Sequence, residues 1–250
     1  AGINSGKKTR GHRFHAPSTF AVSDFTEYRA RLLEAKVLID PAERRQRILD
    51  GAHKLARDSN LEMVMDESLI SEVVGLVEWP VPLMGNFDPA FLEVPSEVLV
   101  TTMKANQKYL SLRNAGGSLA PNFITVANLE APDSGKKIIA GNEYVLSARL
   151  ADAQFFWKQD LIKTLESRLP ALNQIVFHTK LGSLGDKVTR IQKISRHLTK
   201  YVPGADQELA ARAALLCKAD LVSDMVNEFP EVQGIMGYYY AINDGENMEV

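Results

Sequence analysis

The sequence predicts an α+β fold in which a mixed helix and antiparallel-sheet domain, residues 1–140, precedes an all-α domain, residues 171–250, with a connecting helix at 141–170. Three observations lead to this prediction. In the first 140 residues, amphipathic stretches with a helical period alternate with short stretches of period two. Turn residues separate these stretches, which favours hairpins. From Gly141 onward only the helical period remains.

Composition and hydropathy are those of an ordinary soluble protein. Apolar residues make up 45% of the 250-residue chain and charged residues 24%, which is typical of globular domains. No apolar run approaches the roughly 18 residues that a membrane-spanning helix needs, and the N-terminus lacks a signal-peptide pattern. The single cysteine, Cys217, cannot form an internal disulfide, and we expect its thiol to be buried in an apolar helix. These features favour a cytoplasmic protein.

Charge is distributed unevenly along the chain. Residues 1–60 carry 12 Lys and Arg against 7 Asp and Glu, whereas residues 201–250 carry 2 against 9. A nucleic acid would be attracted to the first segment and repelled by the last. The alternative is that both segments are solvated faces. For Arg44, Arg45 and Arg47, which lie mostly off the apolar stripe of their helix, a solvated face is the favoured interpretation.

The first 22 residues form a basic, glycine-containing segment. Lysine and arginine side chains neutralise phosphates without needing a rigid backbone to position them. The segment is therefore compatible with a phosphate-contacting arm. Its candidate contacts are Arg10, His12 and Arg13. It is equally compatible with a strand and a turn.

Three helices are expected after this arm. Spacing predicts the first over residues 24–36. The second has Asp40 as N-cap, Pro41 at its first position and Glu43 in a variant of the capping box, and the third begins after Asp66. The expected apolar stripes are Phe25, Tyr28, Leu32 and Leu33, then Ile48, Leu49, Ala52, Leu55 and Ala56, then Leu69, Ile70, Val73, Val74 and Val77.

Residues 75–108 organise the rest of the chain. Trp79, Pro80 and Pro82 stop the third helix and push the backbone into an extended segment, because proline disfavours helical geometry at and before its position. A helix restarts with Ser96 as its expected N-cap. Its C-terminal end presents a basic, amide-rich cluster that we expect to be exposed: Lys104, Asn106, Gln107 and Lys108.

The remaining elements of the first domain are predicted from the alternation of side chains and from the turn residues between them. Residues 109–113 and 122–129 alternate in the manner of strands around a turn at 114–117. With an extended piece at 81–84, they predict a mostly antiparallel sheet covered by helices. Residues 134–137 are expected to form a loop that ends the sheet.

The second half is expected to consist of helices alone. One long helix is predicted over residues 142–165, and Pro170 breaks the chain after it. Two further helices are predicted at 181–198 and 206–226. Pro230 interrupts the tail.

No motif for catalysis or nucleotide binding is visible. The Gly-rich phosphate loops G-x-x-x-x-G-K-[ST] and G-x-G-x-x-G are absent, Cys217 has no histidine beside it, and residues 182–185 do not form a nucleophile elbow. The five histidines are too scattered to suggest a metal set: His12, His15, His53, His178 and His197. We therefore expect no catalytic residue, no metal and no other cofactor in this chain.

Six strings in the chain, several longer than ten residues, carry a resemblance to a known family. They are GHRF at 11–14, EWPVPLMGNFDPAFLEVPSEVLVTTMKANQKYL at 78–110, PNFI at 121–124, GNEYVLSARLADAQFFWKQDL at 141–161, LGSLGDKVTRI at 181–191 and EFPEVQGIMGYYYA at 228–241. In the same order along nearly the whole chain, they resemble the beta subunit of the bacterial two-subunit glycyl-tRNA synthetase. Since that subunit is much longer and this chain opens at Ala1 without methionine, we interpret the chain as a fragment.

The resemblance implies a division of labour. In this family the glycine and ATP site, which uses Mg, belongs to a separate alpha subunit, and the beta subunit supplies tRNA recognition within an assembly of two alpha and two beta chains. This chain would belong to a glycine-tRNA ligase without making the bond itself. Eight residues, chosen by charge and position, are candidate tRNA contacts: Arg10, His12, Arg13, Lys104, Gln107, Lys108, Lys187 and Arg190.

The resemblance also carries domain assignments. Residues 1–140 resemble the B3/B4-like module of the phenylalanyl-tRNA synthetase beta chain, and 171–250 resemble part of an HD-type metal domain. A working metal site would need a histidine at position 219, where this chain has Ala219 beside Asp220, and too few converging ligands remain. Two alternatives stay open, a metal phosphohydrolase of the HD superfamily and a scaffold that docks the alpha subunit without touching RNA.

Overall fold

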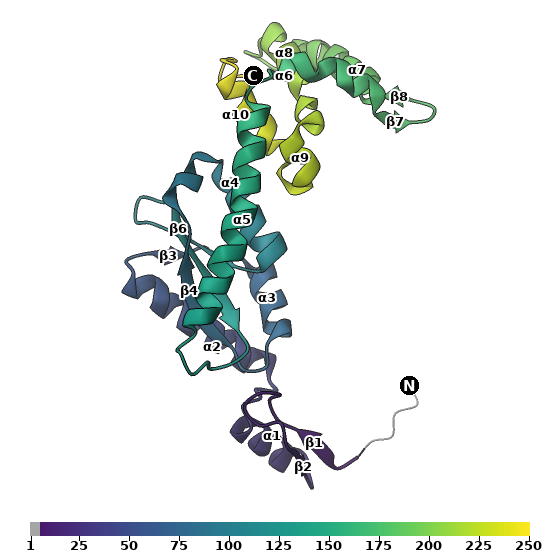
Figure 1. Ribbon diagram of the computed structural model, residues 1–250. Coiled ribbons are helices and arrows are strands. Elements are labelled where there is room, and N and C mark those ends of the chain that lie inside the picture. The colour runs from purple at the N-terminus through teal and green to yellow at the C-terminus, as the bar shows by residue number, and fades with distance from the viewer. Residues whose placement is uncertain (1–5) are drawn as a thin grey trace. The chain divides into compact units, whose positions relative to one another are not determined.

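The structure is a computed structural model that describes residues 6–250 and falls into two compact units (Figure 1). The first contains the chain up to Ala90 together with Met103–Ala148, and the second contains Phe91–Thr102 together with Arg149–Val250. Helices dominate, and all the strand pairs of the described chain are antiparallel. The α+β class predicted from the sequence is confirmed. Across the described residues, no helix is long and apolar enough to cross a membrane.

A two-stranded hairpin opens the described part of the first unit. Strand β1 (Lys8–Arg10) pairs with β2 (Thr19–Ala21). The basic segment at the start of the chain therefore contains a strand and a turn from residue 6 onward. Its residues 1–5 lie outside the described residues.

Three helices then follow as predicted: α1 (Phe25–Glu34), α2 (Pro41–Asp58) and α3 (Glu67–Leu76). Each begins after an aspartate whose carboxylate accepts a backbone N–H of the first turn, namely Asp24, Asp40 and Asp66. Such caps satisfy donors that the helix itself leaves unpaired. Local side-chain chemistry thus sets all three starting points.

Two details of these helices differ from the expectation. Glu43 does not complete a capping box; it pairs instead with Arg29 of the preceding helix. In α1 only Leu32 is buried, whereas Phe25 and Leu33 are 68% and 50% exposed. One row of side chains therefore anchors α1, and the predicted wider stripe is wrong.

The core of the first unit lies where α2 and α3 pack against the main sheet. Helix α2 contacts α3 and two strands of the main sheet, β3 (Glu62–Met63) and β4 (Val81–Asn86). The core residues are Ile48, Leu49, Ala52, Ala56, Leu69, Ile70, Val73, Val74, Val77, Leu110, Leu112, Ala120 and Ile124. Except for Leu55, which is only partly buried, the predicted stripes of α2 and α3 are confirmed.

The arginines of α2 hold this packing together. Arg44 donates to the carbonyls of Leu38 and Ile39 at 2.7 and 2.9 Å and to Val74 at 3.0 Å. Arg47 donates to the carbonyl of Pro80 at 2.9 Å. For Arg44 and Arg47 the interpretation as a solvated face is therefore wrong, whereas Arg45, whose side chain is 39% exposed, pairs with the exposed Glu67 at 2.9 Å.

The main sheet has the strand order β3-β5-β6-β4. Pro82 lies on the edge strand, where a missing N–H is tolerated. Gly85 on the same strand is required by contact, because a Cβ there would lie 2.5 Å from the ring of the buried Phe123. The strands are β3 (Glu62–Met63), β4 (Val81–Asn86), β5 (Leu110–Arg113) and β6 (Leu119–Ala127).

The segment after the sheet edge is only partly as predicted. A 3-10 helix η1 (Pro89–Glu93) is followed by α4 (Ser96–Thr101) and a π-helical turn η2 (Thr102–Asn106). Ser96 is not the N-cap. Pro95 takes that position without a side-chain capping bond, so Ser96 is already the first helical residue.

The long helix α5 (Lys136–Asp160) begins earlier and ends earlier than predicted. Its start lies within the expected loop 134–137, because the carboxylate of Asp133 accepts the N–H groups of Gly135 and Lys137 at 3.0 Å. It ends at Asp160, whose side chain is engaged elsewhere in the second unit.

The second unit is mostly helical, but it is not all-α. A short hairpin, β7 (Val176–His178) and β8 (Gly182–Ser183), precedes α7, which begins at Leu184 because Ser183 forms a capping box with Asp186. The predicted helix 206–226 is broken, since Ser223 caps a new helix. The helices are α6 (Leu165–Arg168), η3 (Leu169–Gln174), α7 (Leu184–Leu198), η4 (Thr199–Tyr201), α8 (Gln207–Leu216), η5 (Ala219–Val222), α9 (Asp224–Glu228), η6 (Pro230–Val232) and α10 (Ile235–Asn243).

Candidate nucleic-acid interface

The first group of candidate contacts divides into a buried histidine and two exposed arginines. The His12 side chain is fully buried, with Nε2 2.5 Å from the carbonyl oxygen of Asn128, and its backbone N–H donates to Ala35 at 2.9 Å. His12 therefore fixes the N-terminal segment within the first unit and is not on a surface that RNA can reach. Arg10 and Arg13 are exposed, and neither forms an ion pair with a described residue.

Gly11, the residue before His12, is also required by packing within the first unit. A Cβ at Gly11 would lie 2.4 Å from the Cβ of Ala35 and 2.8 Å from the carbonyl oxygen of Ala16. Only glycine allows this close approach of three segments. Gly11 and His12 of the GHRF string are therefore explained by packing.

The second group, at the end of the π-helical turn, is neutralised by α3 and its cap. The Lys104 ammonium lies 2.5 Å from the carboxylate of Asp66, and that of Lys108 lies 2.9 Å from Glu72. The hydrogen bond from Lys104, together with the N–H of Leu69, lowers the pKa of Asp66 to about 2. The expected basic cluster is therefore partly exposed but paired with acids.

Gln107 of the same group also has a neighbour within the first unit. Its side-chain oxygen lies 3.5 Å from the phenol of Tyr109, which is buried and stacked on Phe123. Burial raises the pKa of Tyr109 to about 12. Gln107 thus borders the core of the sheet.

The third group lies on α7 and keeps its charge unpaired. The ammonium of Lys187 lies 3.9 Å from the ring centre of Phe177, and Arg190 donates to the carbonyl of Leu181 at 2.9 Å. These contacts hold the β7–β8 hairpin against the start of α7. Neither cation forms an ion pair with a described carboxylate, although the positive charge of Arg190 helps to lower the pKa of Asp186.

Three further cations beside this group were missed. Lys180, Lys193 and Lys200 are exposed, and they form no ion pair in the part of the chain that the structure describes. The signal in the sequence was local charge: residues 176–200 carry six Lys and Arg and one acid, Asp186.

Ala219 and Asp220, which occupy the position of the HD-type metal motif, have a structural role. Asp220 is buried and its carboxylate accepts the N–H of Gly234 at 2.5 Å, while Ala219 is fully buried beside it. Asp220 therefore joins η5 to the start of α10. Residues 6–250 contain no cluster of three or more His, Cys, Asp or Glu that could hold a metal.

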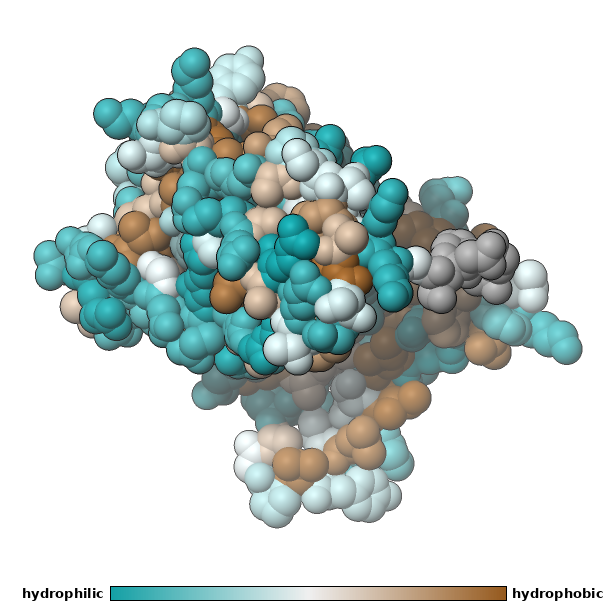
Figure 2. All heavy atoms as spheres, turned by 90° about the horizontal axis from the view of Figure 1, so that it is seen from below, coloured by the Kyte–Doolittle hydropathy of each residue, from teal (hydrophilic) through white to brown (hydrophobic). Residues whose placement is uncertain are grey.

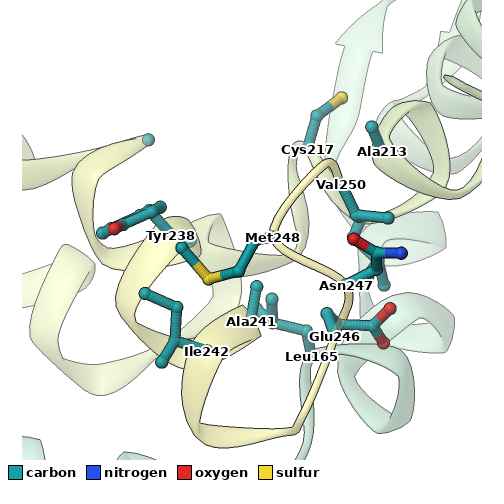
Figure 3. Close-up of a pocket in the computed structure, with 13 residues that line it drawn as sticks. Leu165, Ala213, Cys217, Tyr238, Ala241, Ile242, Glu246, Asn247, Met248 and Val250 are labelled. Carbon is teal, nitrogen blue, oxygen red and sulfur yellow. The ribbon is translucent and has the colours of Figure 1, made fainter. Parts of the chain in front are cut away.

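The second unit contains an apolar pocket of about 390 Å³ (Figure 3). Cys217 lines it together with Tyr238 and Met248. Cys217 is exposed, so the expectation of a buried cysteine is wrong. Partial burial of its thiol nevertheless raises the pKa of that group. The carboxylate of Glu246 at the rim is held by Arg212.

The described part of the chain is an α+β protein in which several lysines and arginines form no ion pair. Residues 1–250 match the family model described as glycyl-tRNA synthetase beta subunit. The chain belongs to this family.

Curated relatives agree over the whole chain. It is 49% identical over 253 residues to the glycine--tRNA ligase beta subunit of Phenylobacterium zucineum, covering 100% of this chain and 38% of the relative. It is 50% identical over 254 residues to that of a Ruegeria species, covering 100% and 37%. For Coxiella burnetii the identity is 49% over 240 residues, 96% of this chain and 34% of the relative. The chain thus spans between a third and two fifths of the length of these relatives.

Proposed function

We propose that this chain contributes tRNA recognition and subunit assembly to a glycine-tRNA ligase. The ligase would charge tRNA(Gly) with glycine at the expense of ATP. The observation that carries this proposal is the family match over residues 1–250. The glycine, ATP and Mg sites would lie on an alpha subunit, in a cytoplasmic assembly of two alpha and two beta chains.

The proposed tRNA contacts are the candidate lysines and arginines that form no ion pair with a described carboxylate. Arg10 and Arg13 on the first unit and Lys187 and Arg190 on the second meet this condition. Unpaired cations release counterions when they meet phosphate, whereas paired ones must first lose a partner. As tRNA contacts we therefore rank these four residues above Lys104, Gln107 and Lys108. We exclude His12 as a contact because its side chain is buried.

The same proposal covers the domains. Residues 1–140 would form a B3/B4-like domain, 141–170 a connecting helix and 171–250 part of a helical HD-like domain. Asp220 with Ala219 would make that HD-like part a structural relative without metal chemistry, since its carboxylate already accepts a backbone N–H.

Glycine-dependent exchange of pyrophosphate into ATP tests whether adenylate formation belongs to the alpha subunit and not to this chain. We expect none with this chain alone, and exchange in every mixture that contains a catalytically competent alpha subunit, because adenylate formation needs only the site that binds glycine and ATP. The control is an alpha subunit assayed alone at the same concentration. Exchange by the isolated chain would contradict the proposal.

A further inference from the structure

Charge is segregated within the second unit. Residues 176–200, which form the β7–β8 hairpin, α7 and η4, carry six Lys and Arg and one acid, whereas residues 201–250 carry two against nine. Figure 1 shows the hairpin at the start of α7 and α8 beside that helix. The positive charge of this unit therefore gathers on the hairpin, α7 and η4, which follow one another along the chain.

Helix geometry aligns most of this charge along one side. Residues at spacings of three or four lie on the same helix face. Counting from Lys187, successive spacings of three, three, four and three lead to Arg190, Lys193, His197 and Lys200; Arg196, which lies three residues after Lys193, is left out because it pairs with Glu208. We call this set the cationic strip; its members are Lys187, Arg190, Lys193, His197 and Lys200. At about 1.5 Å of rise per residue, the strip is roughly 20 Å long.

The opposite side of α7 faces the protein. Val188 is 3% exposed, and α7 packs along α8. Arg196, which is not part of the strip, pairs with Glu208 of α8 at 3.0 Å. The fold thus neutralises the cation that borders α8 and leaves the strip outside that contact.

The single carboxylate of this segment is already occupied. Asp186 accepts the N–H and the hydroxyl of Ser183 at 2.8 and 3.0 Å, and these hydrogen bonds lower its pKa. No Lys or Arg of the strip forms an ion pair within residues 6–250. Neighbouring cations that form no ion pair repel one another, so an anionic ligand would relieve the repulsion.

An exposed aromatic pair ends the strip. Tyr201 is 71% exposed, and its ring packs edge-on against His197 with 5.5 Å between ring centres. Surfaces that bind single-stranded nucleic acid combine cations for the backbone with rings on which bases stack. An acidic protein partner would use the cations but would gain less from a protruding ring.

We propose that the cationic strip of α7 and η4 binds the sugar-phosphate backbone of an RNA and that an unpaired base of this RNA stacks on Tyr201. This inference rests on the proposed function and assigns it a surface and a kind of RNA element. Lys193 and Lys200 are contacts that the candidate residues from the sequence did not include.

The test is a titration of fluorescent tRNA(Gly) with this chain over a range of salt concentrations. In the Lys193→Gln/Lys200→Gln variant, the slope of log K against log salt should be smaller by about two. Neither side chain makes a hydrogen bond or ion pair within the described residues, so the fold should be unchanged. The matched control is Lys54→Gln/Arg57→Gln on α2, which removes the same charge from exposed, unpaired positions and should keep the wild-type slope.

Tyr201→Leu separates stacking from charge. It should weaken binding about tenfold at every salt concentration, because stacking on the ring is lost. The slope should not change, because a neutral ring neutralises no phosphate and releases no counterions. Wild-type affinity in this variant would contradict the stacking.

The outcomes distinguish the two levels of the proposal. If the wild-type chain binds tRNA without salt dependence or not at all, the proposed RNA role fails. If the wild type binds with salt dependence and the Lys193→Gln/Lys200→Gln variant has the same slope, the strip is not the RNA surface. If that variant keeps the slope but loses binding to an alpha subunit, the strip is a protein interface and the inference is overturned.

Discussion

Replacing Asp160 with asparagine is expected to lower the free energy of unfolding of the second unit by about 3–5 kcal/mol. The carboxylate is 1% exposed and accepts the N–H groups of Asp224 and Met225 at 3.0 and 2.9 Å and the hydroxyl of Tyr240 at 2.8 Å. It also pairs with Arg168, itself 8% exposed, at 3.1 Å. A neutral amide would leave that guanidinium buried without a counter-charge, and its NH2 group would face other donors.

The neighbours of Asp160 leave little room for compensation. Burial, followed by the negative charge of Asp160, raises the pKa of Tyr240, so this hydroxyl remains a donor. The Nε of Arg168 has no hydrogen-bond partner among the described residues. The network therefore depends on a single carboxylate to hold the end of α5 to the start of α9.

Fluorotryptophan labelling makes this measurement specific to each unit. The chain has two tryptophans, Trp79 in the first unit and Trp157 in the second, where Trp157 stacks on Tyr240. Urea unfolding followed by ¹⁹F NMR should show the Trp157 transition at much lower urea in Asp160→Asn. The control is Asp152→Asn, an exposed position on the same helix, which should shift it by less than about 0.5 kcal/mol. An equal shift in both variants would refute the role of Asp160 in this network.

Removing the indole of Trp79 should cost the first unit about 3–5 kcal/mol in Trp79→Ala. The ring is 7% exposed, Arg47 and Lys36 lie 3.9 and 4.6 Å from its centre, and Nε1–H donates to Glu130 at 3.0 Å. That hydrogen bond, followed by the charges of Lys36 and Arg47, lowers the pKa of Glu130. The variant would lose buried apolar area and a cation–π partner for both cations.

Hydrogen exchange measured by mass spectrometry tests this prediction. Peptides from α2 and β4 should lose protection in Trp79→Ala. The control is Trp79→Phe, which keeps an aromatic face but loses the hydrogen bond to Glu130 and part of the buried ring, and which should lose less protection than Trp79→Ala. Equal protection in Trp79→Ala and the wild type would show that the organising stretch does not depend on this ring.

Local chemistry is what the sequence predicted well. The starting residues of α2 and α3 follow from Asp40 and Asp66, because a cap needs only its own first turn. The extended course of β4 follows from Pro80 and Pro82. The hairpin of β5 and β6 follows from the turn at 114–117.

Short and long-range features were not predictable in this way. The strands β3 and β8 contain two residues each, too few for a period to be seen. The partners of Lys104 and His12 lie 38 and 116 residues away along the chain. A sequence pattern counts such charges and rings but does not say which acid or carbonyl they will meet.

The same limit explains the outcome for the candidate site. Two of its lysines are paired with acids of α3 and its cap, and its histidine is buried. Arg10, Arg13, Lys187 and Arg190 form no ion pair with a described residue. The surface itself is mixed: in Figure 2, apolar side chains lie in separate groups among hydrophilic ones. Neither charge counts nor hydropathy alone would have separated free cations from paired ones.

The central claim is that this chain offers an RNA-binding surface, and the affinity of the wild-type chain for tRNA(Gly) at two salt concentrations tests it most directly. With three or more phosphate contacts, raising monovalent salt from about 50 to about 200 mM should weaken binding by at least about tenfold. A chain that binds an alpha subunit but shows no salt-sensitive affinity for tRNA would be a scaffold, and its proposed role in RNA recognition would be wrong.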